Sequence, residues 1–216
     1  MILNDLLNGK SINQTPVWIM RQAGRYLPEY REIRKTSDNF IDFCLTPEKA
    51  CEVTLQPIKR FNFDASIIFS DILLVPHAIG REVRFVPGTG PVLDRINAIN
   101  ELVLPSFDKF RDYLRPVADA VKLTRDSLPK ETALIGFSGA PWTLMTYLIE
   151  GGSSRDFHIA RNWLWSKPAE SEKLLHYLSE YIVSFLTLQA NAGVDVLMLF
   201  DSWAGVVPAS HRKNII

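Results

Sequence analysis

The sequence predicts an α/β protein built around a parallel sheet. Short, continuously apolar runs alternate along the chain with longer stretches of helical periodicity, and this alternation is typical of parallel sheets covered by helices. Polar residues follow directly after the apolar runs. These patterns fit two architectures, a doubly wound sheet and a (β/α)8 barrel. Both place their functional sites at the carboxyl ends of the strands.

Length and composition place the chain among ordinary globular proteins. Of its 216 residues, 47% are hydrophobic and 22% are charged, which excludes a disordered chain. The 24 basic residues balance the 24 acidic ones, so the net charge does not point to nucleic acid or an anionic membrane as a partner. Two cysteines, Cys44 and Cys51, cannot form a disulfide framework. No signal peptide is recognisable and no apolar run reaches the roughly 18 residues of a membrane span, so we expect a cytoplasmic protein of one domain.

The first half of the chain carries two predicted strands, a helix and a hairpin. An apolar, β-rich run predicts a strand over 17–20. Thr46 is a candidate N-cap and Pro47 takes the first position of a helix that continues to Arg60. A buried strand is predicted over 65–69, directly before Ser70 and Asp71. An alternating run that meets Pro and Gly residues predicts a hairpin over 80–94.

Helices and strands continue to alternate in the second half. We predict a helix over 106–128, a strand over 133–137 and a helix that begins at Pro141 and ends at Gly151. Apolar residues near 3.6 spacing predict a further helix over 168–192, which Gly193 closes. A last core strand, over 194–200, ends before Asp201 and Ser202.

The motif Arg21-Gln-Ala-Gly-Arg25 is a candidate anion-binding turn. It places two guanidiniums four residues apart after a predicted strand. Arginine is suited to bidentate capture of carboxylate or phosphate, and Gly24 allows an anion or backbone to approach closely. The alternative is a solvated basic turn without a ligand.

Asp71 and Tyr147 each have a functional and a purely structural interpretation. Asp71 has apolar sequence on both sides, so its carboxylate needs hydrogen-bond donors and its pKa is open to tuning. The alternative for Asp71 is a helix N-cap. Taken alone, Tyr147 is typical of a core aromatic whose hydroxyl is satisfied.

Other catalytic chemistries have weaker support. Gly136-Phe-Ser138-Gly-Ala140 imitates a nucleophile elbow, and Asp201 and His211 follow in the order of a hydrolase triad. The acid and the histidine are close in sequence for that fold, so we favour a tight strand-to-helix turn. The four histidines lack metal-ligand spacing with one another or with the cysteines, and we therefore predict no metal site.

Four segments together resemble the uroporphyrinogen decarboxylase family. They are 16–30, with Arg-Gln-Ala-Gly-Arg; 67–73, with Ser-Asp-Ile-Leu; 136–147, with Ser-Gly-Ala-Pro-Trp; and 200–205, with Asp-Ser-Trp-Ala-Gly. The resemblance is ordered and runs through essentially the whole chain. It implies a (β/α)8 barrel, a cytosolic homodimer and a reaction that needs no metal or organic cofactor. In that reaction, part of haem biosynthesis, the four acetates of uroporphyrinogen III are decarboxylated to methyl groups, which gives coproporphyrinogen III.

The resemblance also implies roles for the residues of the basic turn. Both guanidiniums would bind carboxylates of the substrate, and the intervening backbone would lie close to the macrocycle. The residues concerned are Arg21, Gln22, Ala23, Gly24 and Arg25.

Three further residues match positions that contact the substrate in the family. Asp71 would accept hydrogen bonds from the pyrrole N–H groups and stabilise the positive charge of a pyrrole that is protonated on carbon. Tyr147 and Ser202 would hydrogen-bond a substrate carboxylate. The general acid that protonates the product carbon is not indicated by the sequence.

Part of the family pattern is not found in this sequence. We predict about four core strands, half of the number in a (β/α)8 barrel, and the segment that supplies a substrate-binding histidine in the family has no counterpart. We therefore expect residues 1–216 to form a single, C-terminally incomplete domain with an open sheet edge. One alternative is an inactive fragment that only binds porphyrinogen or dimerises. A second is a zinc and thiol methyltransferase of the same superfamily.

Overall fold

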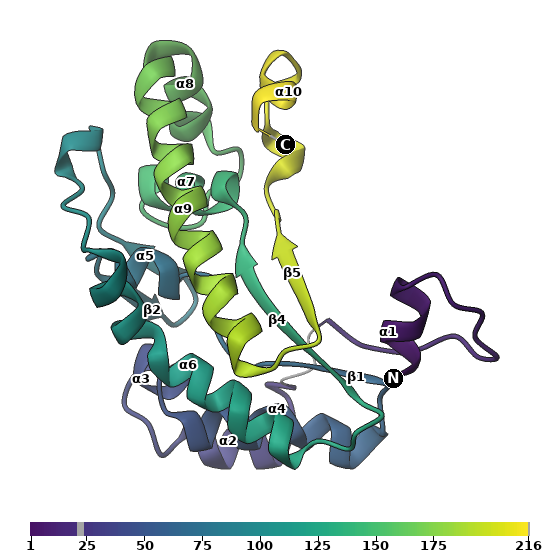
Figure 1. Cartoon of the computed structure of the whole chain (residues 1–216). Helices are drawn as coiled ribbons and strands as arrows, with labels where there is room; N and C mark the ends of the chain where they lie inside the picture. The colour runs from purple at the N-terminus through teal and green to yellow at the C-terminus, as the bar shows by residue number, and fades with distance from the viewer. Residues whose placement is uncertain (21–23, 216) are drawn as a thin grey trace. The chain divides into compact units, whose positions relative to one another are not determined.

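A computed structural model describes residues 1–20 and 24–215 and shows an α/β fold (Figure 1). The strands are β1 (Ala65–Ile67), β2 (Val83–Val86), β3 (Gly90–Leu93), β4 (Ala133–Gly139) and β5 (Val196–Phe200). The α-helices are α1 (Ile2–Leu7), α2 (Pro28–Arg34), α3 (Phe40–Cys44), α4 (Pro47–Phe61), α5 (Leu74–Ala78), α6 (Phe107–Ser127), α7 (Pro141–Glu150), α8 (His158–Ser166), α9 (Pro168–Ala192) and α10 (Arg212–Ile215). Short 3-10 turns lie at η1 (Ile99–Glu101), η2 (Ala204–Val206) and η3 (Ala209–His211).

The main sheet consists of three strands in the order β1-β4-β5. β1 and β4 pair in parallel, with Ala65 opposite Ala133 and Ile67 opposite Ile135. Every residue of β4, the central strand, is buried, as expected for a parallel strand with a continuously apolar sequence. The parallel sheet confirms the predicted fold class at this level.

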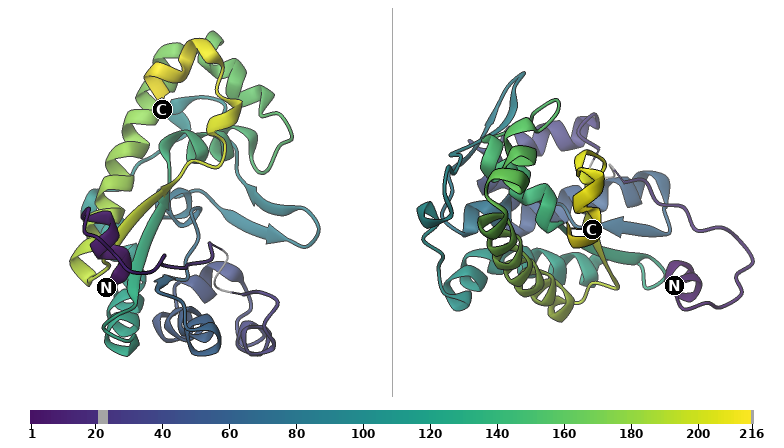
Figure 2. Two further views of the ribbon diagram at one scale, coloured as in Figure 1. Left: turned by 90° about the vertical axis from the view of Figure 1, so that its right-hand side faces the viewer. Right: turned by 90° about the horizontal axis from the view of Figure 1, so that it is seen from above.

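The predicted hairpin and the long predicted helices are confirmed. β2 and β3 pair antiparallel within the predicted span and appear as a two-stranded ribbon in Figure 2. Proline stands at the first position of α4, α7 and α9, where its fixed φ and missing N–H are tolerated. Thr46 occupies the N-cap position of α4, but its side chain makes no capping hydrogen bond; its hydroxyl donates to the carbonyl of Asp42 at 2.7 Å.

The expected strand over 17–20 is wrong. In the described residues this run forms no strand, and Val17, Ile19 and Met20 are more than half exposed. Val17 pairs with the chain beside β1: its N–H donates to the Asp64 carboxylate at 2.7 Å and its carbonyl accepts the Asp64 N–H at 3.0 Å. A strand needs a continuous ladder of partners, so the described main sheet has three strands instead of the four core strands that we expected.

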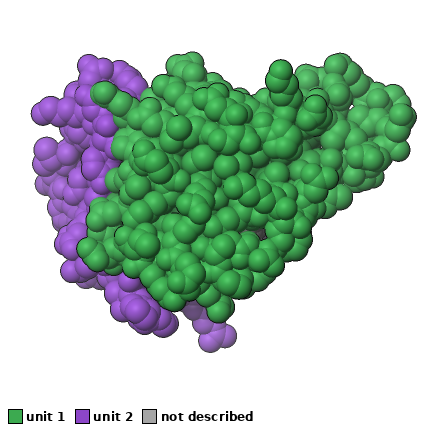
Figure 3. Space-filling model, turned by 90° about the horizontal axis from the view of Figure 1, so that it is seen from below, with its two compact units in different colours: residues 1–71, 114–137, 186–198 green, residues 72–113, 138–185, 199–216 purple. Residues whose placement is uncertain are grey.

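The chain divides into two compact units, coloured green and purple in Figure 3. Unit 1 comprises Met1–Asp71, Leu114–Phe137 and Leu186–Met198, and unit 2 comprises Ile72–Tyr113, Ser138–Phe185 and Leu199–Ile216. Within the described part of the chain, no helix is both long enough and apolar enough to cross a membrane.

The core of unit 1 is organised by α4. This helix contacts α2, α3 and β1 and buries most of its length. The hydroxyl of Thr54 accepts the N–H of Phe69 at 2.9 Å, and the hydroxyl of Ser66 donates to the carbonyl of Thr54 at 3.3 Å. These bonds attach α4 to β1 and to the segment after it, which leads to Asp71.

Candidate functional site

In unit 1, the described part of the basic motif begins at Gly24, because Arg21, Gln22 and Ala23 lie outside the described residues. Gly24 is buried and has a left-handed φ of 52°, a conformation that favours glycine. Its carbonyl accepts the N–H of Leu27 at 2.7 Å, which closes a turn before α2. The turn leaves Arg25 exposed, with its guanidinium carbon 5.1 Å from the centroid of the Phe40 ring.

A second guanidinium, which our sequence analysis missed, contacts the same aromatic ring. Arg34 is half-buried at the end of α2, with its guanidinium carbon 6.0 Å from the Phe40 centroid and 5.6 Å from the Phe43 centroid. It also donates to the carbonyl of Ser37 at 2.6 Å. Phe40 is thus shared by both arginines. Pro28, at the first position of α2, was the sequence signal that could have predicted this helix and hence the return of Arg34 toward Arg25.

An aromatic cluster supports the two arginines. The ring centroids of Tyr30 and Phe43 are 5.9 Å apart, and those of Phe43 and Phe69 are 5.1 Å apart. Burial raises the pKa of the Tyr30 phenol, while the positive charges of Arg25 and Arg34 act to lower it. The phenol therefore remains protonated and neutral around pH 7.

Asp71 follows β1 and belongs to the same group of charges. It is half-exposed, and it is not the N-cap of the next helix, because Leu73 takes that position in α5. The pKa of the fully buried Cys44 thiol is raised well above its usual value, first by burial and second by the negative charge of Asp71. Arg25 and Arg34 oppose this shift. All three charged residues belong to unit 1.

This arrangement suits a ligand that carries both carboxylates and N–H groups. Arg25 and Arg34 can each donate paired N–H groups to an anion. The Asp71 carboxylate can accept hydrogen bonds or stabilise a positive charge that develops on a ligand.

Unit 2 holds the other two predicted site residues. Tyr147 is buried on α7, and its ring meets the edge of the Trp203 ring at a centroid distance of 6.5 Å. Ser202 is exposed in the turn after β5, immediately before Trp203. The turn is fixed to α7, because the indole N–H of Trp142 donates to the carbonyl of Trp203 at 2.9 Å. Tyr147 and Ser202 therefore belong to one packed group within unit 2.

The structure does not assemble the hydrolase triad. Ser138 is completely buried in β4, and its hydroxyl donates to the neighbouring carbonyl of Gly139 at 3.2 Å. Asp201 accepts a hydrogen bond from Thr143 at 2.7 Å, and the Nδ1 atom of His211 lies 3.0 Å from the hydroxyl of Ser210. Each member of the supposed triad thus has a different partner. Among the described residues, no three His, Cys, Asp or Glu side chains gather closely enough to hold a metal ion.

Comparison with known proteins decides the family. The family model described as uroporphyrinogen decarboxylase (URO-D) matches residues 2–215. This chain belongs to the uroporphyrinogen decarboxylase family. The resemblance that we inferred from four segments, and expected over essentially the whole chain, is thereby confirmed.

Curated uroporphyrinogen decarboxylases are similar to the chain over most of its length. The one from Rhodospirillum rubrum is 48% identical over 208 residues, which are 95% of this chain and 60% of the relative. Those from Mesorhizobium japonicum and Agrobacterium fabrum are each 50% identical, over 95% and 94% of this chain and 60% and 58% of the relatives. The chain thus spans about 60% of the length of these uroporphyrinogen decarboxylases.

A solved structure supports the fold. A methyltransferase from Methanosarcina mazei matches with a TM-score of 0.75 and 19% sequence identity, over 98% of this chain and 62% of that one. At this identity the likeness establishes the fold alone. The identities near 50% to uroporphyrinogen decarboxylases favour that family over the methyltransferase alternative.

Proposed function

We propose that this chain acts in uroporphyrinogen decarboxylation: the cofactor-free conversion of the four acetate side chains of uroporphyrinogen III to methyl groups. The observation that carries the proposal is the pair of guanidiniums, those of Arg25 and Arg34, that contact the Phe40 ring in unit 1, in a chain of this family. The product would be coproporphyrinogen III. We further propose that the protein works in the cytoplasm as a homodimer and that its sheet belongs to a (β/α)8 barrel.

The arginines provide the binding step of this proposal. Uroporphyrinogen carries four acetates and four propionates, so binding requires concentrated positive charge in a chain whose net charge is zero. The guanidinium carbons of Arg25 and Arg34 lie 5.1 and 6.0 Å from the centroid of the Phe40 ring, and each guanidinium can form paired hydrogen bonds with a carboxylate. Arg21 of the same motif would add a third guanidinium.

Asp71 provides the electrostatic step. A pyrrole ring protonated on carbon withdraws electrons, so the bond between the acetate methylene and its carboxylate breaks and CO2 leaves. The bonding pair moves into the ring; a proton then adds to the methylene carbon, and loss of the proton on the ring carbon restores the pyrrole. The negative charge of Asp71 favours the positively charged ring over the neutral one, and its oxygens can accept pyrrole N–H groups. The substrate ring itself is thus the electron sink, as a cofactor would otherwise be.

Tyr147 and Ser202 complete the proposed substrate contacts. Each carries a hydroxyl that can donate to a carboxylate. Ser202 is exposed in its turn, so it is accessible to a ligand, and Tyr147 stands beside Trp203 in the same unit.

We also propose that residues 1–216 form part of one barrel domain. Alternate residues of β5 are exposed, with Leu197 44% and Leu199 53% accessible. In a soluble protein such side chains on a strand are usually covered. The relatives are longer than this chain, and this additional length is consistent with a barrel that has more strands than the sheet described above.

A second candidate function is binding of the porphyrinogen without turnover. The chain spans about 60% of the length of the relatives, so it can hold the arginine cluster without all of the groups that complete the reaction.

One experiment tests both functions. The purified chain is incubated with uroporphyrinogen III without oxygen, and coproporphyrinogen is followed by chromatography while binding of uroporphyrin is measured by fluorescence. Coproporphyrinogen formation is the expected result, and binding without turnover would support the second candidate. A chain that neither binds nor converts the tetrapyrrole would overturn both.

The Asp71→Ala variant sharpens this test. We expect it to lower turnover at least about 100-fold, because a preorganised charge at the reacting ring is lost. Asp38→Ala, which removes an exposed carboxylate of the same unit, is the matched control and should retain turnover. Unchanged turnover in Asp71→Ala would show that Asp71 does not have the proposed role.

A further inference from the structure

The turn that carries Ser202 is held from both sides by one buried hydroxyl. Thr143, on α7, is fully buried. Its hydroxyl donates to a carboxylate oxygen of Asp201 at 2.7 Å and accepts the backbone N–H of Trp203 at 3.2 Å. These are the residues immediately before and after Ser202. The contacts of Thr143 thus fix the backbone around Ser202 without involving the Ser202 side chain.

Other contacts hold the same turn to the rest of unit 2. The carbonyl of Trp203 accepts the indole N–H of Trp142 at 2.9 Å, and the Trp203 ring packs against the buried Phe157 ring at a centroid distance of 4.5 Å. The N–H of Ala204 donates to the carbonyl of Asp201 at 3.1 Å. These contacts set the position of Trp203, whereas only Thr143 joins both neighbours of Ser202 among the hydrogen bonds of the described residues.

The same helix also carries Tyr147. Thr143 and Tyr147 are four residues apart on α7, so they lie on one face of the helix, one turn apart. Tyr147 meets the Trp203 ring and Thr143 binds the Trp203 backbone. A single helix face therefore contacts both the ring and the backbone of Trp203, the residue directly after Ser202.

We propose that Thr143 is a positioning residue, which orients the Ser202 hydroxyl toward a carboxylate of the substrate. The proposal rests on the function proposed above. It also gives Asp201 a structural role: its carboxylate accepts the hydrogen bond of the Thr143 hydroxyl and helps to fix the conformation of the turn. A threonine hydroxyl can donate once while it accepts, and both capacities are used here.

Two matched variants separate this role from simple packing. Thr143→Val keeps the shape and removes the hydroxyl, whereas Thr143→Ser keeps the hydroxyl and removes a methyl group. We expect amide hydrogen exchange of Trp203 to accelerate at least about tenfold in Thr143→Val and to stay within about twofold of wild type in Thr143→Ser, because only Val removes the acceptor of this N–H.

Binding of uroporphyrin, followed by fluorescence titration, tests the connection to Ser202. We expect Thr143→Val to raise the Kd about threefold to tenfold, the equivalent of one hydrogen bond, and Ser202→Ala to do the same. The double variant should bind no more weakly than Ser202→Ala alone, because Thr143 acts through Ser202. Should Thr143→Val fail to fold, Asp201→Ala removes the Thr143–Asp201 bond from its half-exposed end and is expected to raise the Kd in the same way.

The outcomes distinguish this proposal from the function on which it rests. A wild-type chain that does not bind uroporphyrin would overturn the proposed function. Normal wild-type binding, combined with unchanged Trp203 exchange in Thr143→Val, would overturn only the role of Thr143. The role of Thr143 would also be overturned if the increases in Kd caused by Thr143→Val and Ser202→Ala multiplied in the double variant, because the two residues would then act independently.

Discussion

Two buried glutamines in unit 1 differ in the hydrogen bonds that their amide groups make. Gln189, on α9, is fully buried; its amide accepts the N–H of Phe137 and donates to the carbonyl of Phe137, both at 2.9 Å. It therefore acts as a strand partner for β4, close to Gly136, where an added Cβ would lie 2.7 Å from the Gln189 oxygen. Gln56, on α4, is 7% exposed, and neither polar atom of its amide has a hydrogen-bond partner among the described residues.

Replacement of each glutamine by methionine, which has a similar shape, should have opposite effects. Gln56→Met is expected to raise the free energy of unfolding by about 1 kcal/mol, because a buried amide without partners is removed. Gln189→Met should lower it by about 2–3 kcal/mol, because two buried backbone groups of Phe137 lose a partner. Urea denaturation measures both values, and equal destabilisation by the two variants would contradict the hydrogen bonding described for them.

At the residue scale, the sequence predicted part of the candidate site. Arg25 and Asp71 were singled out from their sequence context, Arg25 for the two guanidiniums of its motif and Asp71 for the apolar sequence around it. Their roles stay predictions, and the strand expected before the basic motif does not form in the described residues. Arg34 and Thr143 were missed. Arg34 depends on how α2 returns over Phe40, and Thr143 depends on contacts with residues about 60 positions away, which no local pattern contains.

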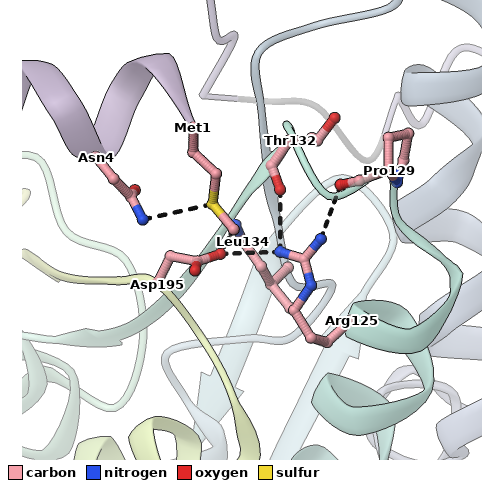
Figure 4. A network of polar contacts seen from close by, with 7 residues as sticks. All are labelled: Met1, Asn4, Arg125, Pro129, Thr132, Leu134 and Asp195. Carbon is pink, nitrogen blue, oxygen red and sulfur yellow. Dashed lines mark hydrogen bonds and ion pairs between the residues drawn. The ribbon is translucent and has the colours of Figure 1, made fainter.

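At the scale of elements, one ion pair joins the ends of α6, β4 and β5 in unit 1 (Figure 4). The Arg125 guanidinium donates to the Asp195 carboxylate at 2.9 Å and to the carbonyls of Thr132 and Pro129 at 3.0 and 2.9 Å. The same Asp195 oxygen accepts the N–H of Leu134 at 2.7 Å. Both charged side chains are largely buried, at 21% and 16% exposed, so water cannot easily replace either partner.

Removal of this carboxylate should destabilise unit 1. Asp195→Ala is expected to lower the free energy of unfolding by about 2–3 kcal/mol, because the largely buried guanidinium loses its carboxylate partner and the backbone N–H of Leu134 loses its acceptor. Glu32→Ala is the control, since its ion pair with Lys35 is about 70% exposed on both sides; exposed pairs contribute little, and its effect should stay within about 0.5 kcal/mol. Equal effects in thermal or urea denaturation would rule out a special role for the Arg125 network.

Helices and strands were predicted accurately where residues close in the sequence determine them, and missed where distant residues do. α4, α7 and α9 begin with proline and were predicted close to their observed bounds. α8 was missed, because its first N–H groups are capped from a distance: the Glu150 carboxylate accepts the N–H groups of Ile159 and Ala160 at 2.9 and 3.0 Å. The run over 17–20 has strand-like composition without a strand partner in the described residues, which composition alone cannot reveal.

At the scale of the whole molecule, positive and negative charges balance, but the residues that we propose to bind anions are concentrated in unit 1. The chain has 24 basic and 24 acidic residues, so no overall field attracts a polyanion. In unit 1, Arg25 and Arg34 nevertheless face the same aromatic ring. The proposed tetrapyrrole, which is rich in carboxylates, must therefore bind through these side chains, and its affinity should fall as salt screens them.

The most direct measurement of this central claim is the affinity of the purified chain for uroporphyrin, obtained by fluorescence titration of wild type and three single variants. We expect Arg25→Ala and Arg34→Ala each to weaken binding about tenfold or more, because each removes a charge-assisted pair with a carboxylate. Arg31→Ala, which removes an exposed guanidinium from the same helix α2, should bind as wild type does. Equal losses in all three variants, or unchanged binding in Arg25→Ala and Arg34→Ala, would contradict the account.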